Sequence, residues 1–249
     1  LIVDPNPPFT REEYETAKFI EEELHKLVLN TRRVGETGVY ALLEGTKPGK
    51  ALILRADIDA LPITETHECP YKSVNDGKMH ACGHDAHTAA LLGAAKILVN
   101  HKDDIKGSIA FCFQQAEEIG YGANLFVNEG LVKGDRCFGI HLASNIECGK
   151  VSATAGPNNA SVDYFKIKVN GSCAHVSTPE LGIDAVYIAS MITVGAQGLV
   201  TRRTNPTDSV IIGIGKIVAG TAYNIVAGEA VLEGTIRVMY PEIRSQVKA

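Results

Sequence analysis

The run Ala51-Leu52-Ile53-Leu54 is apolar at every position and leads directly into the polar sequence Arg55-Ala56-Asp57-Ile58-Asp59. A run that is apolar on both alternating faces is typical of a strand buried on both sides of a parallel sheet. Two further runs, at 108–113 and 137–142, have the same character, and segments with helical spacing lie between the strands. This alternation predicts an α/β domain with a mostly parallel sheet.

The composition changes between residues 149 and 161, where glycine, serine, alanine, asparagine and proline are frequent, which indicates a domain border. Residues 164–169 then alternate between apolar and charged, as a strand with one solvated face does. A helical pattern, two strands and a second helix follow, an order that matches the ferredoxin-like split motif without its last strand. We therefore predict two domains, 1–157 and 158–249, and we expect the natural protein to continue beyond Ala249.

The overall composition is that of an ordinary globular protein, with 45% hydrophobic and 21% charged residues. The formal net charge of −5 gives no electrostatic basis for binding nucleic acid or an anionic membrane. No apolar run in the sequence approaches the length that spans a bilayer. The six cysteines are scattered and lie mostly in apolar contexts, so we expect reduced thiols and a cytoplasmic protein.

The segment 79–87, Met-His-Ala-Cys-Gly-His-Asp-Ala-His, places one thiol, three imidazoles and one carboxylate close together in the chain. Those side chains are the ligands that zinc and related transition metals prefer. Further polar groups follow the predicted strands, and these are Asp57, Asp59, Glu117, Glu118 and His141. Because sites in open α/β sheets form at the carboxyl ends of strands, we expect all these segments to converge on one pocket.

Two segments resemble a known enzyme family, namely 54–63 (LRADIDALPI) and 78–88 (KMHACGHDAHT). They are similar to the dimetal metallopeptidases related to aminoacylase and glutamate carboxypeptidase. The similarity is greatest to the amidohydrolase branch, which comprises hippurate hydrolases, N-acyl-amino-acid amidohydrolases and indole-acetyl-amino-acid hydrolases. Matching segments continue at 113–118, 138–141 and 234–237, so the resemblance covers nearly the whole chain.

The resemblance implies an α/β catalytic domain of the phosphorylase/hydrolase type and a ferredoxin-like α+β domain that serves as lid and dimerisation domain. It implies two divalent metal ions, zinc or manganese with cobalt as a further option. The reaction would be hydrolysis of the amide C–N bond of an N-acyl amino acid or a dipeptide by a metal-activated water. The protein would thus be an amidohydrolase or a metallocarboxypeptidase, and a homodimer joined through the lid domains.

The family's functional positions fall on particular residues of this sequence. Four of them match metal-ligand positions: Cys82, His84, Glu118 and His141. Two match catalytic positions, the general acid/base and the group that steadies the oxyanion in the partner subunit's site: Glu117 and His175. Four would orient the ligands: Asp57, Asp59, Asp85 and His87. Two would hold the substrate carboxylate: Asn224 and Arg237.

The sequence departs from the family pattern in three places. The segment 172–175 has no glycine pair before its histidine, and 224–228 lacks the isoleucine-proline-aspartate run that the family favours. Both differences concern the fit of the substrate more than the chemistry. The family takes one more metal-ligand histidine from a C-terminal return to the catalytic domain, and we expect that ligand beyond Ala249.

Two other interpretations stay open at this point. Cys82 could be the nucleophile of a thiol hydrolase with a nearby histidine as base, which leaves Glu117, Glu118 and His141 without a role. Alternatively, the chain could be an inactive or truncated member of the family that acts as a dimeric binding module. Activity that is lost to a chelator and restored by manganese or zinc would favour the metal enzyme over both.

Overall fold

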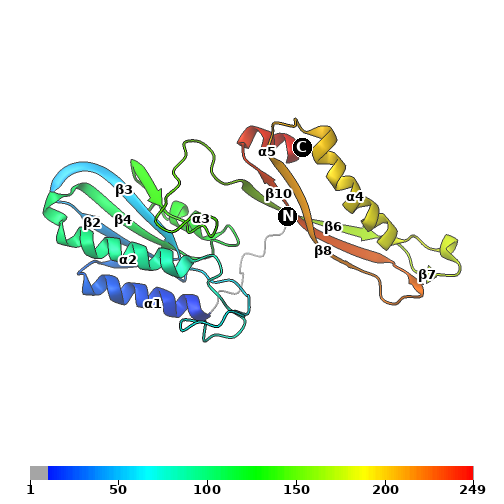
Figure 1. The fold of residues 1–249 in the computed structure, drawn as a ribbon, viewed down its shortest axis with the longest axis horizontal. Helices are drawn as coiled ribbons and strands as arrows, with labels where there is room; N and C mark the ends of the chain where they lie inside the picture. The colour runs from blue at the N-terminus through cyan, green and yellow to red at the C-terminus, as the bar shows by residue number, and fades with distance from the viewer. Residues whose placement is uncertain (1–10, 249) are drawn as a thin grey trace. The chain divides into compact units, whose positions relative to one another are not determined.

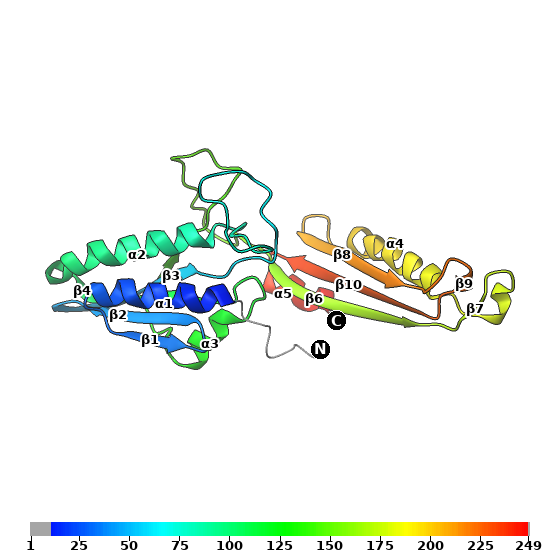
Figure 2. The same cartoon turned by 90° about the horizontal axis from the view of Figure 1, so that it is seen from below.

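The computed structural model describes residues 11–248, which form two compact units, one ending at Lys150 and the other beginning at Val151. Each unit has its own sheet and its own hydrophobic core (Figure 1 and Figure 2). Among the described residues, no helix is both long enough and apolar enough to cross a bilayer.

The first unit is built on a five-stranded sheet with the order β1-β2-β4-β3-β5. The strands are β1 (Thr31–Val34), β2 (Gly38–Glu44), β3 (Lys47–Asp57), β4 (Lys106–Gln114) and β5 (Arg136–Gly139). β3 pairs in parallel with β4 and β5, whereas β2 pairs antiparallel with β1 and β4. The sheet is therefore mixed, and the prediction of a mostly parallel sheet is wrong for its β1–β2 side.

Short connections explain the antiparallel side of the sheet. A tight turn containing Gly35, at a φ of 57°, joins β1 to β2, and so short a link can connect only antiparallel strands. The link from β2 to β3, residues 45–46, is also short and reverses the chain again, so β2 runs opposite to β3. β4 lies between these two strands in the sheet and is parallel to β3, so it must be antiparallel to β2.

Three helices cover the two faces of this sheet: α1 (Arg11–Lys26), α2 (His84–Asn100) and α3 (Gly122–Asn128). Side chains alternate along β4, so Phe111 and Phe113 pack in the core beneath α1 and α2. Ala110 and Cys112 lie on the other face, against Phe126 of α3. The strand is buried on both faces, which accounts for its continuous apolar sequence.

The second unit has a three-stranded antiparallel sheet with the order β6-β10-β8, formed by β6 (Ser161–Asn170), β10 (Glu229–Val238) and β8 (Val210–Ala219). Helix α4 (Ala185–Arg203) packs through Ala185 and Ala189 on this sheet. Helix α5 (Pro241–Lys248) follows β10. β7 (Ala174–His175) and β9 (Ile225–Val226) pair as a two-stranded antiparallel ribbon.

Two side chains fix the helices of the second unit. Helix α4 begins at Ala185 because the Asp184 carboxylate accepts hydrogen bonds from the backbone N–H groups of Val186 and Tyr187. Arg244 of α5 makes a bidentate ion pair with Asp163 of β6, with both N–O distances 2.7 Å.

A buried carboxyl group lies between α1 and the sheet of the first unit. Glu13 is only 5% exposed, and its Oε2 atom accepts a hydrogen bond from Thr37 Oγ1 at 3.4 Å. Burial, reinforced by the nearby Asp59 carboxylate, raises the pKa of Glu13 to about 7. The folded protein therefore binds this proton more tightly than the unfolded chain, and it loses stability as the pH rises through 7.

Replacing Glu13 with glutamine should remove this pH dependence. At pH 8, where Glu13 is ionised in both states, we expect Glu13→Gln to raise the free energy of unfolding by up to about 3 kcal/mol. At pH 4 the carboxyl group is protonated in both states, so the gain should disappear. Urea titrations at the two pH values measure the difference, and an equal effect at both would contradict a buried ionisation.

Candidate metal centre

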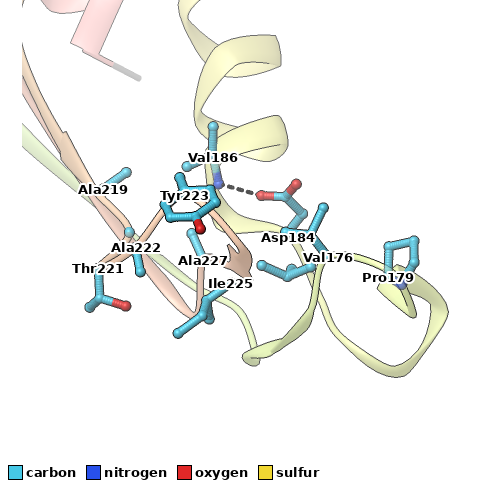
Figure 3. Close-up of a pocket in the computed structure, with 12 residues that line it drawn as sticks. Val176, Pro179, Asp184, Val186, Ala219, Thr221, Ala222, Tyr223, Ile225 and Ala227 are labelled. Atoms are coloured by element: carbon cyan, nitrogen blue, oxygen red, sulfur yellow. Dashed lines mark hydrogen bonds between the residues drawn. The ribbon is translucent and has the colours of Figure 1, made fainter.

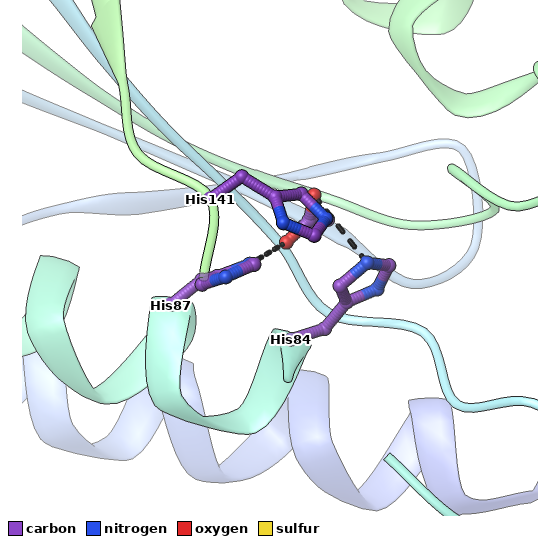
Figure 4. A group of neighbouring side chains, drawn as sticks. His84, His87 and His141 are labelled. Atoms are coloured by element: carbon purple, nitrogen blue, oxygen red, sulfur yellow. Dashed lines mark hydrogen bonds and ion pairs between the residues drawn. The ribbon is translucent and has the colours of Figure 1, made fainter. Parts of the chain in front are cut away.

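Four segments of the first unit meet where β3, β4 and β5 end. Figure 4 shows the rings of His84 and His87, from the first turns of α2, turned toward His141 from the segment after β5. The ligand atoms form two overlapping groups, and within each group they lie within 4.8 Å of one another. One group contains Asp57, His84, His87 and His141, and the other contains Cys82, His84 and Glu118. All four expected metal ligands belong to these groups.

Gly83 brings the cysteine-histidine segment close to the segment after β5. Its φ of 81° is in the left-handed region, and α2 begins at the next residue. A Cβ atom at this position would lie 3.0 Å from the Leu142 side chain, so glycine is required both by the conformation and by the close approach. Cys82 and His84 are thereby placed on either side of a turn next to His141.

Ala116 turns the chain at the end of β4. Its φ of 51° is left-handed, a conformation that costs a non-glycine residue about 1 kcal/mol or more. Directly after this turn, the Glu118 backbone N–H donates to Asp59 Oδ2 at 3.0 Å. The two glutamates are thus held at the same sheet edge as the histidines.

His84 is fully buried and presents one bare nitrogen to the cluster. Its Nδ1–H donates to the backbone carbonyl of Asp59 at 2.9 Å, so the lone pair of the neutral ring is on Nε2. Within residues 11–248, Nε2 has no hydrogen-bond partner, although it lies 3.6 Å from Asp57 Oδ2 and 3.8 Å from Glu118 Oε1. A buried lone pair without a partner is costly, and a divalent cation would satisfy it.

The carboxylates around His84 also shift its ionisation. Burial lowers the pKa of His84, but the Asp59 hydrogen bond and the charges of Asp57 and Glu118 outweigh burial and raise it above the ordinary value. The pKa of Asp59 is correspondingly lowered, because hydrogen bonds from His84 and from backbone N–H groups outweigh its burial. The region thus has the negative potential that attracts a cation.

Cys82 and His141 form the second half of the cluster. His141 Nδ1–H donates to the carbonyl oxygen of Leu142 at 2.6 Å, so its Nε2 carries the lone pair and accepts a hydrogen bond from the Cys82 thiol at 3.5 Å. Burial and the charges of Glu118 and Glu117 raise the pKa of the Cys82 thiol to about 11. At neutral pH the thiol is therefore protonated, and a metal that binds it must displace the proton.

Glu117 lies beside the cluster. Its Oε2 atom is 3.9 Å from His84 Nε2, and its side chain is partly exposed. Burial and the adjacent Glu118 charge raise the pKa of Glu117, which moves it toward the range in which a carboxylate can exchange protons near neutral pH.

His87 belongs to the cluster but has no nitrogen available for a metal. Its Nε2 accepts the backbone N–H of Leu142 at 2.8 Å, and its Nδ1–H donates to Asp57 Oδ1 at 2.6 Å. Both nitrogens are used, which agrees with an orienting role. Asp85, by contrast, is exposed in the first turn of α2, where its carboxylate accepts the N–H of Ala86 and makes no described contact with the cluster.

The remaining predicted residues lie in the second unit. His175 is exposed in β7, and the neighbouring Val176 N–H donates to the carbonyl of Asn224 at 3.1 Å, so these two segments lie side by side. A cavity of about 520 Å³ adjoins them, lined by Tyr223 and Asp184 among others (Figure 3). Arg237 is exposed near the far end of β10 and does not join this pair.

Two residues near the cluster were quoted in the sequence motifs but given no role. Arg55 Nη1 donates to Asp57 Oδ2 and Arg55 Nε donates to Gln114 Oε1, both at 2.9 Å. A signal for the first contact was present, because residues two apart on a strand point to the same face. Gln114 could be found only from the register, in which it stands opposite Asp57.

Comparison with known proteins adds independent findings. The model of Peptidase family M20/M25/M40 matches residues 53–238. N-acetyl-L-cysteine deacetylase of Bacillus subtilis (strain 168) is 43% identical over 97% of this chain and 59% of that protein. N-acyl-L-amino acid amidohydrolase of Geobacillus stearothermophilus is 40% identical over 97% of this chain and 66% of that protein.

A solved structure is also similar. The dinuclear metal-binding M20 peptidase YXEP of Bacillus subtilis has a TM-score of 0.75 and 35% sequence identity, over 97% of this chain and 63% of that one. The chain thus spans between 59% and 66% of the length of these three proteins.

Gly83, just before α2, and Gly93, inside the helix, allow a matched test of this turn. Gly83→Ala should destabilise the protein by about 1–2 kcal/mol, because alanine must adopt a left-handed conformation against Leu142. Gly93→Ala, in the helix interior with open space around it, should instead stabilise by roughly 0.5–1 kcal/mol. Thermal unfolding measures both variants, and equal effects of the two would contradict the assigned turn.

Proposed function

The chain belongs to Peptidase family M20/M25/M40, and from this membership and the geometry of the cluster we propose that it is a metal-dependent amidohydrolase. Its substrates are N-acyl amino acids or dipeptides, and it hydrolyses their amide C–N bond. The observation that carries the proposal is the bare, buried Nε2 of His84 with Cys82 and Glu118 gathered around it. The names of the two amidohydrolase-type relatives support the substrate class.

Four residues would hold the metal: Cys82, His84, Glu118 and His141. Both imidazoles use Nδ1–H on a backbone carbonyl and present the lone pair of Nε2, and a thiolate with imidazoles suits zinc, manganese or cobalt better than calcium. Two overlapping ligand groups, together with the dinuclear relative, support a pair of ions. When bound, such ions polarise the amide carbonyl and activate a water.

The proton transfers fall to Glu117. It takes a proton from the attacking water and delivers it to the amide nitrogen as the C–N bond breaks, which releases the amino acid and the free acid. Its raised pKa and its position beside His84 support this role. In the same proposal His175 steadies the oxyanion in the partner subunit's site. Asn224 precedes β10 and Arg237 lies near its end, so these two residues would reach the substrate carboxylate from different subunits.

A thiol hydrolase with Cys82 as nucleophile is less consistent with the electrostatics. A nucleophilic cysteine needs a lowered pKa, whereas burial and neighbouring carboxylates raise that of Cys82 to about 11. His141 Nε2, which is hydrogen-bonded to the thiol, could accept its proton, but the two glutamates nearby would disfavour the thiolate that results.

We propose further that the second unit is a ferredoxin-like lid and dimerisation domain. Tyr187, Met191 and Val194 of α4 are exposed and spaced so that they share one face. β8 is an edge strand and exposes Ile211 and Val218. An exposed apolar helix face beside an open sheet edge is typical of a surface that a second copy covers.

The dimer can be tested at α4. Val194→Asp places a charge in the middle of the proposed interface, so it should convert a dimer to a monomer in sedimentation velocity without lowering the melting temperature of the monomer. A wild-type protein that sediments as a monomer at micromolar concentration would contradict the proposed interface.

The hydrolase can be tested with metal and one substitution. Activity on a panel of N-acyl amino acids should disappear with a chelator and return with zinc or manganese. Glu117→Gln should lower kcat by roughly 100-fold or more with an unchanged metal content, because only the proton transfer is removed. Glu147→Gln, at an exposed carboxylate paired with Lys150, is the control and should be fully active. Full activity of Glu117→Gln, or of the metal-free protein, would refute the proposal.

A further inference from the structure

A continuous line of hydrogen bonds begins at Arg55, near the end of strand β3. Its guanidinium donates to Gln114 Oε1 and to Asp57 Oδ2, both at 2.9 Å, and its side chain is 29% exposed. Asp57 is fully buried, so its carboxylate depends on this cation and on hydrogen bonds for compensation. The fork of Arg55 therefore fixes where the Asp57 carboxylate points.

The line continues from Asp57 to His87 and then to a peptide group. Asp57 Oδ1 accepts from His87 Nδ1–H at 2.6 Å, which commits the lone pair of this ring to Nε2. That lone pair accepts the Leu142 N–H at 2.8 Å. The Leu142 amide nitrogen can only donate, so His87 Nε2 is the acceptor and His87 Nδ1 carries the proton. The donor and the acceptor are therefore known for each hydrogen bond of the line.

The line ends on an expected metal ligand. The carbonyl oxygen of Leu142 accepts from His141 Nδ1–H at 2.6 Å, so the residue that His87 holds by its N–H in turn holds His141 by its C=O. His141 is exposed, and its ring meets the rings of His87 and His84 edge-on, with centroids 4.6 Å and 6.0 Å apart. Its Nε2 accepts the hydrogen bond from Cys82 Sγ at 3.5 Å.

We propose that Arg55 is a positioning residue for His141. Acting through Asp57, His87 and the backbone of Leu142, it holds the His141 ring in the Nδ1–H tautomer with Nε2 turned toward Cys82. The inference rests on the proposed function, in which His141 binds metal. A purely structural role for Arg55, as a counter-ion for a buried carboxylate, would affect stability but would leave the tautomer of His141 unchanged.

The test compares Arg55→Met with Arg136→Met, which removes an exposed arginine at the start of β5. The readouts are proton–nitrogen correlation spectra of the histidine rings in the metal-free protein and titration with zinc. In the wild type and in Arg136→Met, His141 should be the Nδ1–H tautomer. In Arg55→Met the ring should become a mixture of tautomers, and the affinity for one ion should fall roughly 10- to 100-fold.

A double-mutant cycle tests whether the residues act in one line. His87→Phe should reproduce both effects, and Arg55→Met/His87→Phe should bind zinc about as weakly as His87→Phe alone, because members of one network are not additive. If the losses of zinc affinity in the two single variants multiply in the double variant, Arg55 acts by another route. Arg55→Lys keeps the positive charge but cannot bond to Asp57 and Gln114 at once, so its zinc affinity and tautomer ratio should be intermediate. If Arg55→Met does not fold, Arg55→Lys and His87→Phe provide the test.

The two proposals can fail separately. A wild-type tautomer and wild-type zinc affinity in Arg55→Met, with a folded protein, overturn the positioning role while the metal enzyme stands. A wild-type protein that binds no zinc overturns the proposed function, and the ring spectra of the metal-free variants then decide the positioning role by themselves.

Discussion

The site depends on two backbone carbonyl groups that each accept a hydrogen bond from an imidazole Nδ1. The carbonyl of Asp59 holds His84 and that of Leu142 holds His141, so both rings turn the lone pair of Nε2 toward the ligand cluster. Backbone carbonyls can only accept, so they hold each neutral ring in the Nδ1–H tautomer. The turn at Gly83 and the ends of β3 and β5 are the features that bring these carbonyls into place.

Negative charge beneath the site is balanced by few partners. Asp57, Asp59 and Glu13 are all buried within the first unit, and Glu13 has its pKa raised to about 7 as a result. Arg55 compensates Asp57, and His84 with backbone N–H groups compensates Asp59. Within residues 11–248, the Glu13 carboxyl group has one hydrogen bond, a long one from Thr37, and its ionisation lowers the stability of the fold at neutral pH.

Continuous apolar runs were enough to predict β3 and β4 and the sheet edge where the ligands gather, because strands buried on both faces leave no other pattern. β1 was missed because Thr31-Arg32-Arg33-Val34 is short and charged, and without it the β1–β2 hairpin that makes the sheet mixed is invisible. The cluster's ligand types were also predictable. Which imidazole nitrogens are free was not, because it depends on contacts that only the fold makes: His87 Nε2 accepts the Leu142 N–H, whereas His84 Nε2 meets no donor among the described residues.

Leu142 takes part in the site through its peptide group alone, and its side chain is mostly exposed. Selection at such a position acts on the main chain, so the identity of the residue is free to drift as long as Gly83 has room beside it. Proline is the one exception, since it lacks the N–H that His87 binds. A position whose backbone is essential to the site can therefore vary in side-chain identity among relatives.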